Sequence, residues 1–386
     1  MRRLPLEPRT DWQQTAQHFG FRFHTMYGEP YWDESACYAF TLAQIERDLE
    51  DPSAELHAMC LDIVDTIVRE EALLRRLAIP KFAWGWLRDS WLRGERSLYG
   101  RFDFAYDGHG PAKLYEYNAD TPTALYETAF FQWVWLEQAL ERGLIPADCD
   151  QFNSVQETLI GRFGELGIDA TLFLACARGS EEDRGTVDYL RDCAMQAGLH
   201  TDFLHIEDIG IDTQGQFTGL HGEPLRWLFK LYPWEFMLRE PYAPRLPGSD
   251  TYFVEPPWKA LLSNKGLLPL LWERHPQHPN LLPAYFADDP RCGRLGMNFV
   301  RKPLFSREGA NVRVVRHGQI LHDAPGPYGE EGYVLQALRM PPVFDGRHVV
   351  VGSWIVGDTA CGIGLREDAG VVTQDLSRFV PHVILD

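Results

Sequence analysis

The chain has 386 residues, of which 45% are apolar and 24% are charged, and its formal net charge is -18. This length allows a large buried core or two to three lobes, and no apolar run reaches the length of a membrane span or a signal peptide, so we expect a cytoplasmic protein with no membrane partner. The negative charge argues against nonspecific nucleic-acid binding, because contacts to phosphate require lysine and arginine.

A helix is predicted from Asp51, with Asp51 as its N-cap and Pro52 at its first position. Apolar side chains then recur at helical spacing at Leu56, Cys60, Ile63 and Ile67. This stripe is expected to pack into the core.

A β-hairpin is predicted over residues 101–118. In RFDFAY the residues alternate with a period of two, which puts Arg101 and Asp103 on one face and an aromatic row on the other. DGHGP supplies turn residues, and alternation in the return strand KLYEYN puts Glu116 and Asn118 on one side and Tyr115 on the opposite side.

The polar residues of this hairpin suggest a magnesium site. Asp103, Glu116 and Asn118 offer hard oxygen ligands, which suit Mg²⁺ ions that keep waters and substrate phosphates as further ligands. Arg101 beside them suits a transferring phosphoryl group. The alternative is an ordinary antiparallel sheet with its polar face outward.

The middle of the chain predicts a buried amphipathic helix that ends at Gly143, followed by an α/β unit. Strand, helix and strand are predicted over residues 170–177, 181–198 and 201–211, as in a βαβ unit. Neither a G-x-G-x-x-G nor a Walker A motif occurs there.

Two lysines, a glycine loop and a strand mark the C-terminal third. Lys302 lies between an apolar run and Pro303, an unusual position for a solvating charge, whereas an isolated lysine such as Lys265 is ordinarily a surface residue. The loop SREGANV contains Gly309, which permits conformations in which backbone amides face phosphate. A strand is predicted at YVLQAL.

Several motifs in order resemble the glutathionylspermidine synthetase family of ATP-grasp ligases, and they cover nearly the whole chain. They are RFDF with LYEYNADTPT, EPPWKALLSNKGLLPLLW, VRKPLFSREGANV, GPYGEEGYVLQAL and GIGLREDAGVVTQDLSRF. The chain is similar to the stand-alone members that lack an N-terminal amidase domain.

The resemblance implies an α/β (α+β) ATP-grasp fold with a Rossmann-like pre-ATP-grasp domain. Residues 1–150 would form a helical N-terminal region and the metal-binding hairpin of the large lobe. Residues 151–250 would form the pre-ATP-grasp substrate domain, and residues 251–386 the nucleotide-binding lobe and return strands.

The resemblance also implies ATP and Mg²⁺ as cofactors, and small-molecule acid and amine substrates joined through an acyl-phosphate. The metal ligands would be Asp103, Glu116 and Asn118, and the catalytic residues would be Arg101 and Arg366, of which Arg101 also contacts phosphate. ATP would be bound by Lys265, Lys302, Gly309 and the backbone of Gln336, Ala337 and Leu338.

The chain departs from the family's pattern at the substrate positions. The synthetases carry a Ser-x-Ser pair where this chain has Thr121 and Thr123, and the polyamine-using members carry an aspartate where this chain has Arg378. A cation there would repel a polyamine. With Glu235 available to hold an amine, the resemblance implies an amino acid or other zwitterion rather than spermidine.

Two other classes of function stay open at this stage. A chain rich in tryptophan, tyrosine and acids is compatible with a carbohydrate-active hydrolase that uses paired carboxylates, although Lys302, Arg366 and Asn118 then have no role. An ATP-grasp protein that binds nucleotide without ligating anything is the other alternative.

Overall fold

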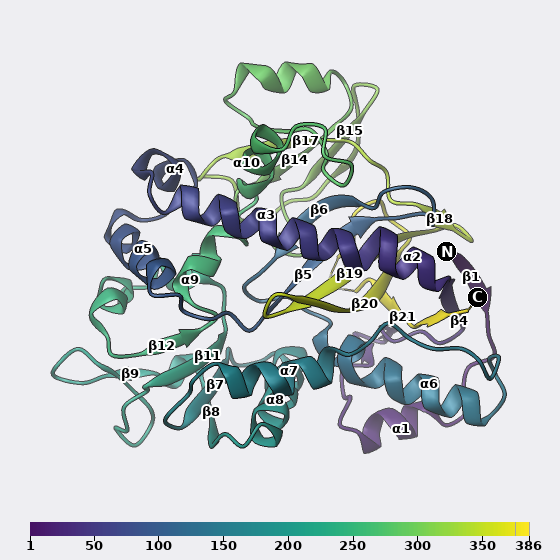
Figure 1. Ribbon diagram of the computed structural model, residues 1–386, viewed down its shortest axis with the longest axis horizontal. Coiled ribbons are helices and arrows are strands. Elements are labelled where there is room, and N and C mark those ends of the chain that lie inside the picture. The colour runs from purple at the N-terminus through teal and green to yellow at the C-terminus, as the bar shows by residue number, and fades with distance from the viewer. Residues whose placement is uncertain (375, 386) are drawn as a thin grey trace.

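The computed structural model describes residues 1–374 and 376–385 and has a mixed α/β fold built around several sheets. Figure 1 shows a central sheet, a small antiparallel sheet above it and a parallel sheet below it. None of the described helices combines the length and the apolar character needed to cross a membrane.

The central antiparallel sheet joins distant parts of the chain. Its strand order is β21 (Arg378–Val380), β20 (Thr359–Asp368), β19 (Arg347–Val356), β5 (Tyr99–Ala105) and β6 (Lys113–Asn118), with β18 (Val343–Phe344) paired to β19. The predicted hairpin is β5 and β6, and it pairs through β5 with the C-terminal strand β19. The central sheet is therefore assembled from segments that are far apart in the sequence.

The helix predicted from Asp51 begins earlier than expected. Helical structure runs without a break through α2 (Leu42–Ile45), a π-helical turn (Glu46–Glu50) and α3 (Asp51–Ile67). Thr41 is the N-cap, and it forms a capping box with Gln44 that satisfies backbone N–H groups at the helix start. Asp51 as an N-cap was therefore wrong. The apolar stripe of α3 is buried as predicted, and α3 crosses one face of the central sheet (Figure 1).

The parallel sheet confirms the predicted strand, helix and strand. Its order is β12 (Tyr252–Val254), β11 (Trp227–Leu231), β7 (Leu172–Cys176) and β8 (Thr201–His205), all parallel, and α8 (Glu181–Gln196) connects β7 to β8. The helix α7 (Val155–Glu165) packs against α8. Because β12 belongs to this sheet, the sheet extends beyond residue 250, where the predicted pre-ATP-grasp domain ended.

The small antiparallel sheet contains the strand predicted at YVLQAL. Its order is β13 (Ala284–Phe286), β17 (Tyr333–Ala337), β14 (Phe299–Pro303), β15 (Arg313–Arg316) and β16 (Gln319–Asp323), and α10 (Leu267–Arg274) packs against β13 and β17. This sheet places Lys302 on β14 beside Gln336 on β17.

A fourth sheet has β4 (Ala36–Phe40) between β1 (Arg2–Pro5) and β22 (His382–Ile384), and Figure 1 shows the two ends of the chain close together there. The predicted buried helix is a π-helical turn (Glu127–Phe131) followed by α6 (Gln132–Glu141). The remaining helices and strands are α1 (Trp12–His18), β2 (Thr25–Met26), β3 (Glu29–Pro30), α4 (Glu71–Arg76), α5 (Trp84–Leu92), β9 (Gly210–Ile211), β10 (Phe217–Thr218) and α9 (Trp234–Met237). Short 3-10 turns lie at Lys81–Ala83, Ile206–Asp208, Ala243–Gly248, Pro257–Leu261 and Pro290–Leu295.

Candidate active site

The β5–β6 hairpin brings the predicted metal ligands to one face. Arg101 lies opposite Asn118 and Asp103 lies opposite Glu116 in the ladder. The register then shifts between Asp103 and Phe104, so that Phe104 lies opposite Leu114 and Tyr115 has no partner.

This β-bulge corrects the side-chain pattern expected from strict alternation. Leu114 is fully buried in the core, whereas Tyr115 lines the same cavity as Glu116. A bulge inserts one residue without partner into a strand, and a period-two pattern in the sequence does not show it.

A cleft lies between the central sheet and the small antiparallel sheet. Its empty volume is about 1350 Å³, which includes open solvent at its mouth. Fourteen of the fifteen site residues predicted from the sequence line it: Arg101, Asp103, Glu116, Asn118, Thr121, Thr123, Glu235, Lys265, Lys302, Gly309, Gln336, Ala337, Leu338 and Arg366. Motifs that are separate in the sequence therefore predicted residues that line one cavity.

Asp103 is the meeting point of two arginines. Its Oδ1 accepts from Arg101 Nε at 2.6 Å, and its Oδ2 accepts from Arg366 Nη2 at 2.8 Å. Burial lowers the pKa of Arg101, but the charge and the hydrogen bond of Asp103, together with Glu116 and Tyr31, outweigh burial and raise that pKa. Burial, together with the charge of Arg101, lowers the pKa of Arg366. The two guanidinium groups thus lie close together around one carboxylate.

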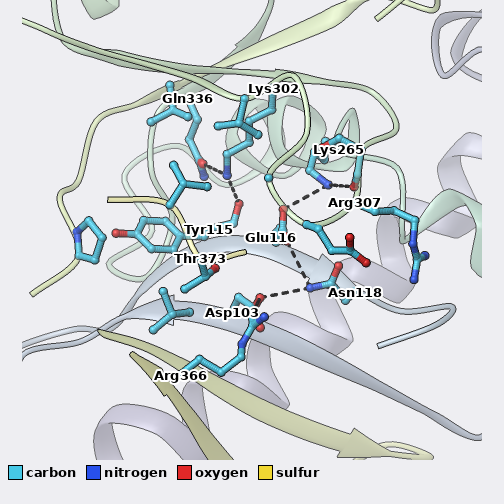
Figure 2. A pocket seen from close by; sticks show the side chains of 18 of the residues that line it. Asp103, Tyr115, Glu116, Asn118, Lys265, Lys302, Arg307, Gln336, Arg366 and Thr373 are labelled. Carbon is cyan, nitrogen blue, oxygen red and sulfur yellow. Dashed lines mark hydrogen bonds and ion pairs between the residues drawn. The ribbon is translucent and has the colours of Figure 1, made fainter. Parts of the chain in front are cut away.

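Glu116 lies between two lysines (Figure 2). Its Oε2 is 3.2 Å from Lys265 Nζ, which also donates to the carbonyl of Ser306. Burial would raise the pKa of Glu116, but the charges of Lys265 and Lys302 outweigh it and lower that pKa to about 2. Burial in turn lowers the pKa of Lys302 to about 8, although Glu116 opposes this shift. Glu116 is therefore ionised throughout the neutral range.

The donor set fits a magnesium ion. Asn118 Nδ2 is 3.3 Å from both Asp103 Oδ2 and Glu116 Oε1, so the three side chains converge. Among residues 1–374 and 376–385, no group of three or more His, Cys, Asp and Glu side chains is placed to hold a metal, so a site here needs the amide oxygen of Asn118 as its third donor. Two carboxylates and an amide suit Mg²⁺, which readily keeps water and phosphate oxygens.

The backbone of Gln336, Ala337 and Leu338, which was predicted to bind ATP, already takes part in other hydrogen bonds. The N–H of Ala337 donates to the carbonyl of Pro283 at 2.7 Å, and the N–H of Leu338 donates to that of Asn298 at 3.3 Å. The Gln336 side chain accepts from Lys302 Nζ and donates to the carbonyl of Leu114. A nucleobase would therefore meet carbonyl oxygens and side chains here.

The loop that contains Gly309 closes against a second loop. Gly309 has a φ of +74°, and a Cβ there would lie 2.8 Å from Val372 Cγ1, so both conformation and space require glycine. Its neighbour Arg307 donates from Nη1 to Thr121 Oγ1 at 2.6 Å and lines the cavity. This loop was predicted from the sequence, but a role for Arg307 was not, because a charged residue in a polar loop is ordinary.

A buried ion pair supports the wall of the cavity that contains Glu235. Lys230 Nζ and Asp120 Oδ1 are 2.7 Å apart, and both side chains are almost fully buried. The other oxygen of Asp120 accepts from the backbone N–H of Trp234 at 2.7 Å, and Lys230 Nζ is 4.1 Å from the centroid of the Trp234 ring. Burial raises the pKa of the adjacent Glu235, whereas the charge of Arg307 opposes this.

Arg378 is the one predicted site residue that does not line the cavity. Its Nη1 forms an ion pair with Asp33 Oδ2 at 3.0 Å. Nothing in the structure supports the predicted substrate contact of Arg378, because its side chain is bound to Asp33 and does not line the cavity. The expected repulsion of a polyamine by Arg378 therefore stays a prediction.

The chain matches one family model and is similar in sequence to several named proteins. The family model described as glutathionylspermidine synthase preATP-grasp matches residues 3–385. A Haemophilus influenzae protein named "Putative acid--amine ligase" is 42% identical over 97% of both chains. The bifunctional glutathionylspermidine synthetase/amidase of Escherichia coli is 27% identical over 88% of this chain and 58% of its own length, and the trypanothione synthetase of Crithidia fasciculata is 26% identical over 84% and 53%.

A solved structure shares the fold at low sequence identity. The glutathione synthetase-like effector of Globodera pallida, in its apo form, aligns with a TM-score of 0.52 and 10% identity over 90% of this chain and 89% of its own. The expectation of an ATP-grasp fold with a pre-ATP-grasp domain is confirmed by this likeness together with the family match. Because one family model spans nearly every residue, the chain belongs to the glutathionylspermidine synthase pre-ATP-grasp family.

Proposed function

We propose that this protein is an ATP- and Mg²⁺-dependent acid–amine ligase that forms an amide through an acyl-phosphate. The observation that carries this proposal is the convergence of Asp103, Glu116 and Asn118 in a cavity lined by four arginines and two lysines. An acidic protein has to concentrate its cations to hold a polyphosphate, and this cavity is where it does so. The names of the relatives support the same reaction class.

Mg²⁺ held by Asp103, Glu116 and Asn118 would supply charge neutralisation between the phosphates of ATP. Lys265 and Lys302 would bind phosphate oxygens from the side of the small antiparallel sheet. Lys302 and Lys265 are already fixed by carbonyl or amide acceptors, so little side-chain freedom is lost when phosphate arrives.

In the first step a substrate carboxylate oxygen attacks the γ-phosphorus. The bond from that phosphorus to the β,γ-bridging oxygen breaks, and ADP leaves. Arg101 and Arg366 would stabilise the negative charge on the transferring group, because both guanidinium groups are held at one place by Asp103.

In the second step the amine nitrogen attacks the acyl carbon. The C–N bond forms, the C–O bond to phosphate breaks, and the amine proton passes to solvent. Glu235, which lines the cavity wall beside Thr121 and Thr123, would hold an ammonium group of a substrate. An amino acid or other zwitterion fits a wall that combines Glu235 with Arg307.

The paired carboxyls of Asp103 and Glu116 do not suit a carbohydrate-active hydrolase. Such an enzyme needs one carboxylic acid that stays protonated to donate to the leaving group. The pKa of Glu116 is lowered to about 2, and Asp103 is bound by two arginines. Neither carboxyl of this pair can serve as the acid.

A screen of ADP release against acids crossed with amines tests the proposal. We expect Mg²⁺-dependent ADP release that needs one acid and one amine together, with the amide detected by mass spectrometry. ATP that binds but is not consumed across a broad panel would contradict ligase activity and would favour a nucleotide-binding protein without ligation.

A further inference from the structure

Tyr115 enters the cavity because of the β-bulge in β6. The register shift leaves Tyr115 without a partner on β5, between the paired residues Leu114 and Glu116. Its ring therefore does not join the core, where Leu114 lies, but lines the cavity next to Glu116. A bulge beside a functional carboxylate is a common means of redirecting a side chain.

Three contacts tie Tyr115 to the small antiparallel sheet and to the segment that follows it. Its hydroxyl donates to the carbonyl of Arg339 at 2.8 Å, and its own carbonyl accepts from Lys302 Nζ at 2.9 Å. Lys302 Nζ is also 5.6 Å from the centroid of the Tyr115 ring. The ring is thus held at its polar end, while its faces need no hydrogen-bond partner.

The surroundings of Tyr115 differ from those of the metal ligands. Figure 2 shows Tyr115, Gln336 and Lys302 on one side of the cavity and Lys265, Arg307 and Asn118 on the other. The cavity also has a set of apolar lining residues, which are Val300, Val312, Val314, Ala337, Leu338, Met340, Pro341 and Val350. Among the described residues that line it, Tyr115 is the only one with an aromatic ring.

We propose that Tyr115 supplies the surface on which the nucleobase of bound ATP stacks, and that its hydrogen bond to Arg339 fixes the ring for this contact. This inference rests on the proposed binding of ATP and assigns a base-contacting role to a residue that has no other role in the proposed site. A base is planar and has few polar groups on its faces, so an aromatic ring among aliphatic side chains complements it better than any other residue in this cavity.

Calorimetry with two probes on the full-length chain separates base contact from phosphate contact. The probes are ATP and inorganic tripolyphosphate, each titrated with Mg²⁺ into the wild type, Tyr115→Leu and Tyr115→Phe. Tyr115→Leu is expected to weaken ATP binding by roughly tenfold, the typical loss of one base–aromatic contact, and to leave tripolyphosphate binding within about twofold. Tyr115→Phe keeps the ring and is expected to stay within about threefold of the wild type for ATP, since only one hydrogen bond is lost.

Other outcomes overturn the inference in distinguishable ways. Equal weakening of ATP and tripolyphosphate in Tyr115→Leu would show that Tyr115 acts on the phosphate site, and unchanged ATP binding would show that no base stacks there. If Tyr115→Leu does not fold, Tyr115→Met gives the same comparison with a flexible apolar side chain. A wild type that binds tripolyphosphate but not ATP refutes the base contact, whereas one that binds neither refutes the proposed function as well.

Discussion

Asp103 binds two cationic side chains in the cavity. It accepts from Arg101 and Arg366 and lies 3.3 Å from the amide nitrogen of Asn118. A buried carboxylate with two cationic partners is well compensated, but loss of its charge would leave those cations facing each other. The proposed metal site and the two arginines proposed to stabilise the transition state therefore depend on one side chain.

Asp103→Asn and Glu116→Gln are expected to abolish Mg²⁺-dependent ATP consumption, because each removes a ligand charge while keeping the side-chain volume. Circular dichroism should report a native fold, and the ADP-release assay should report the loss. Normal turnover in both variants would refute the proposed metal site.

Arg366→Ala and Lys302→Ala should separate chemistry from binding. Arg366→Ala is expected to lower turnover by roughly two orders of magnitude with little change in ATP affinity, on the scale of losing one transition-state charge contact. Lys302→Ala should weaken ATP binding first. Calorimetry that shows equal losses of nucleotide affinity in the two variants would contradict this division of roles.

The lowered pKa of Lys302 predicts a pH dependence of ATP binding. An amine is charged below its pKa, so the cation is present at pH 7 and is lost as the pH rises through about 8. ATP affinity should therefore fall above about pH 8 in the wild type. Lys302→Arg keeps its charge at these pH values and should flatten the profile. An identical decline in both proteins would assign the titration to another group.

At the scale of elements, the buried pair of Asp120 and Lys230 links the loop after β6 to the end of β11. Asp120 also accepts from the backbone N–H of Trp234 at the start of α9. Because Asp120 precedes Thr121 and Trp234 precedes Glu235, this one carboxylate positions both cavity residues. Such a pair contributes more to geometry than to net stability, because burying two charges costs about as much as their attraction returns.

Lys230→Met is expected to destabilise the fold by about 3–5 kcal/mol, because it leaves Asp120 buried and unpaired. The double variant Asp120→Asn with Lys230→Met should lose less than the sum of the two single variants, since neither unpaired charge remains. Urea unfolding of the four proteins measures this coupling. Strict additivity would show that the two side chains do not interact.

Elements were predictable from sequence where the signal was local. The βαβ unit, the hairpin of β5 and β6, and the buried stripe of α3 follow from periodicity and turn residues, and the structure contains all three. The start of the first long helix was missed because Asp51 and Pro52 match an N-terminal signal, although the capping box of Thr41 and Gln44 begins ten residues before Asp51. The bulge at Tyr115 was missed because it depends on the partner strand.

At the scale of the whole molecule, the cavity is built from parts that are distant in sequence. Asp103 and Arg366 meet because β5 and β20 flank β19, and Lys302 arrives from a different sheet. Motifs predict these residues one by one. The contacts of Arg307 and Asp120, and the ion pair of Arg378 with Asp33, depend instead on how loops pack. Those contacts have no local signal in the sequence.

The central step of the proposed reaction is the attack of a substrate carboxylate on the γ-phosphorus of ATP. An acid that gives ADP release can be labelled with ¹⁸O in both carboxylate oxygens, and the released phosphate can then be analysed by mass spectrometry. We expect one ¹⁸O atom in phosphate for each amide formed, because the attacking oxygen leaves with the phosphoryl group. Phosphate that carries only oxygen from ATP and water would contradict this step.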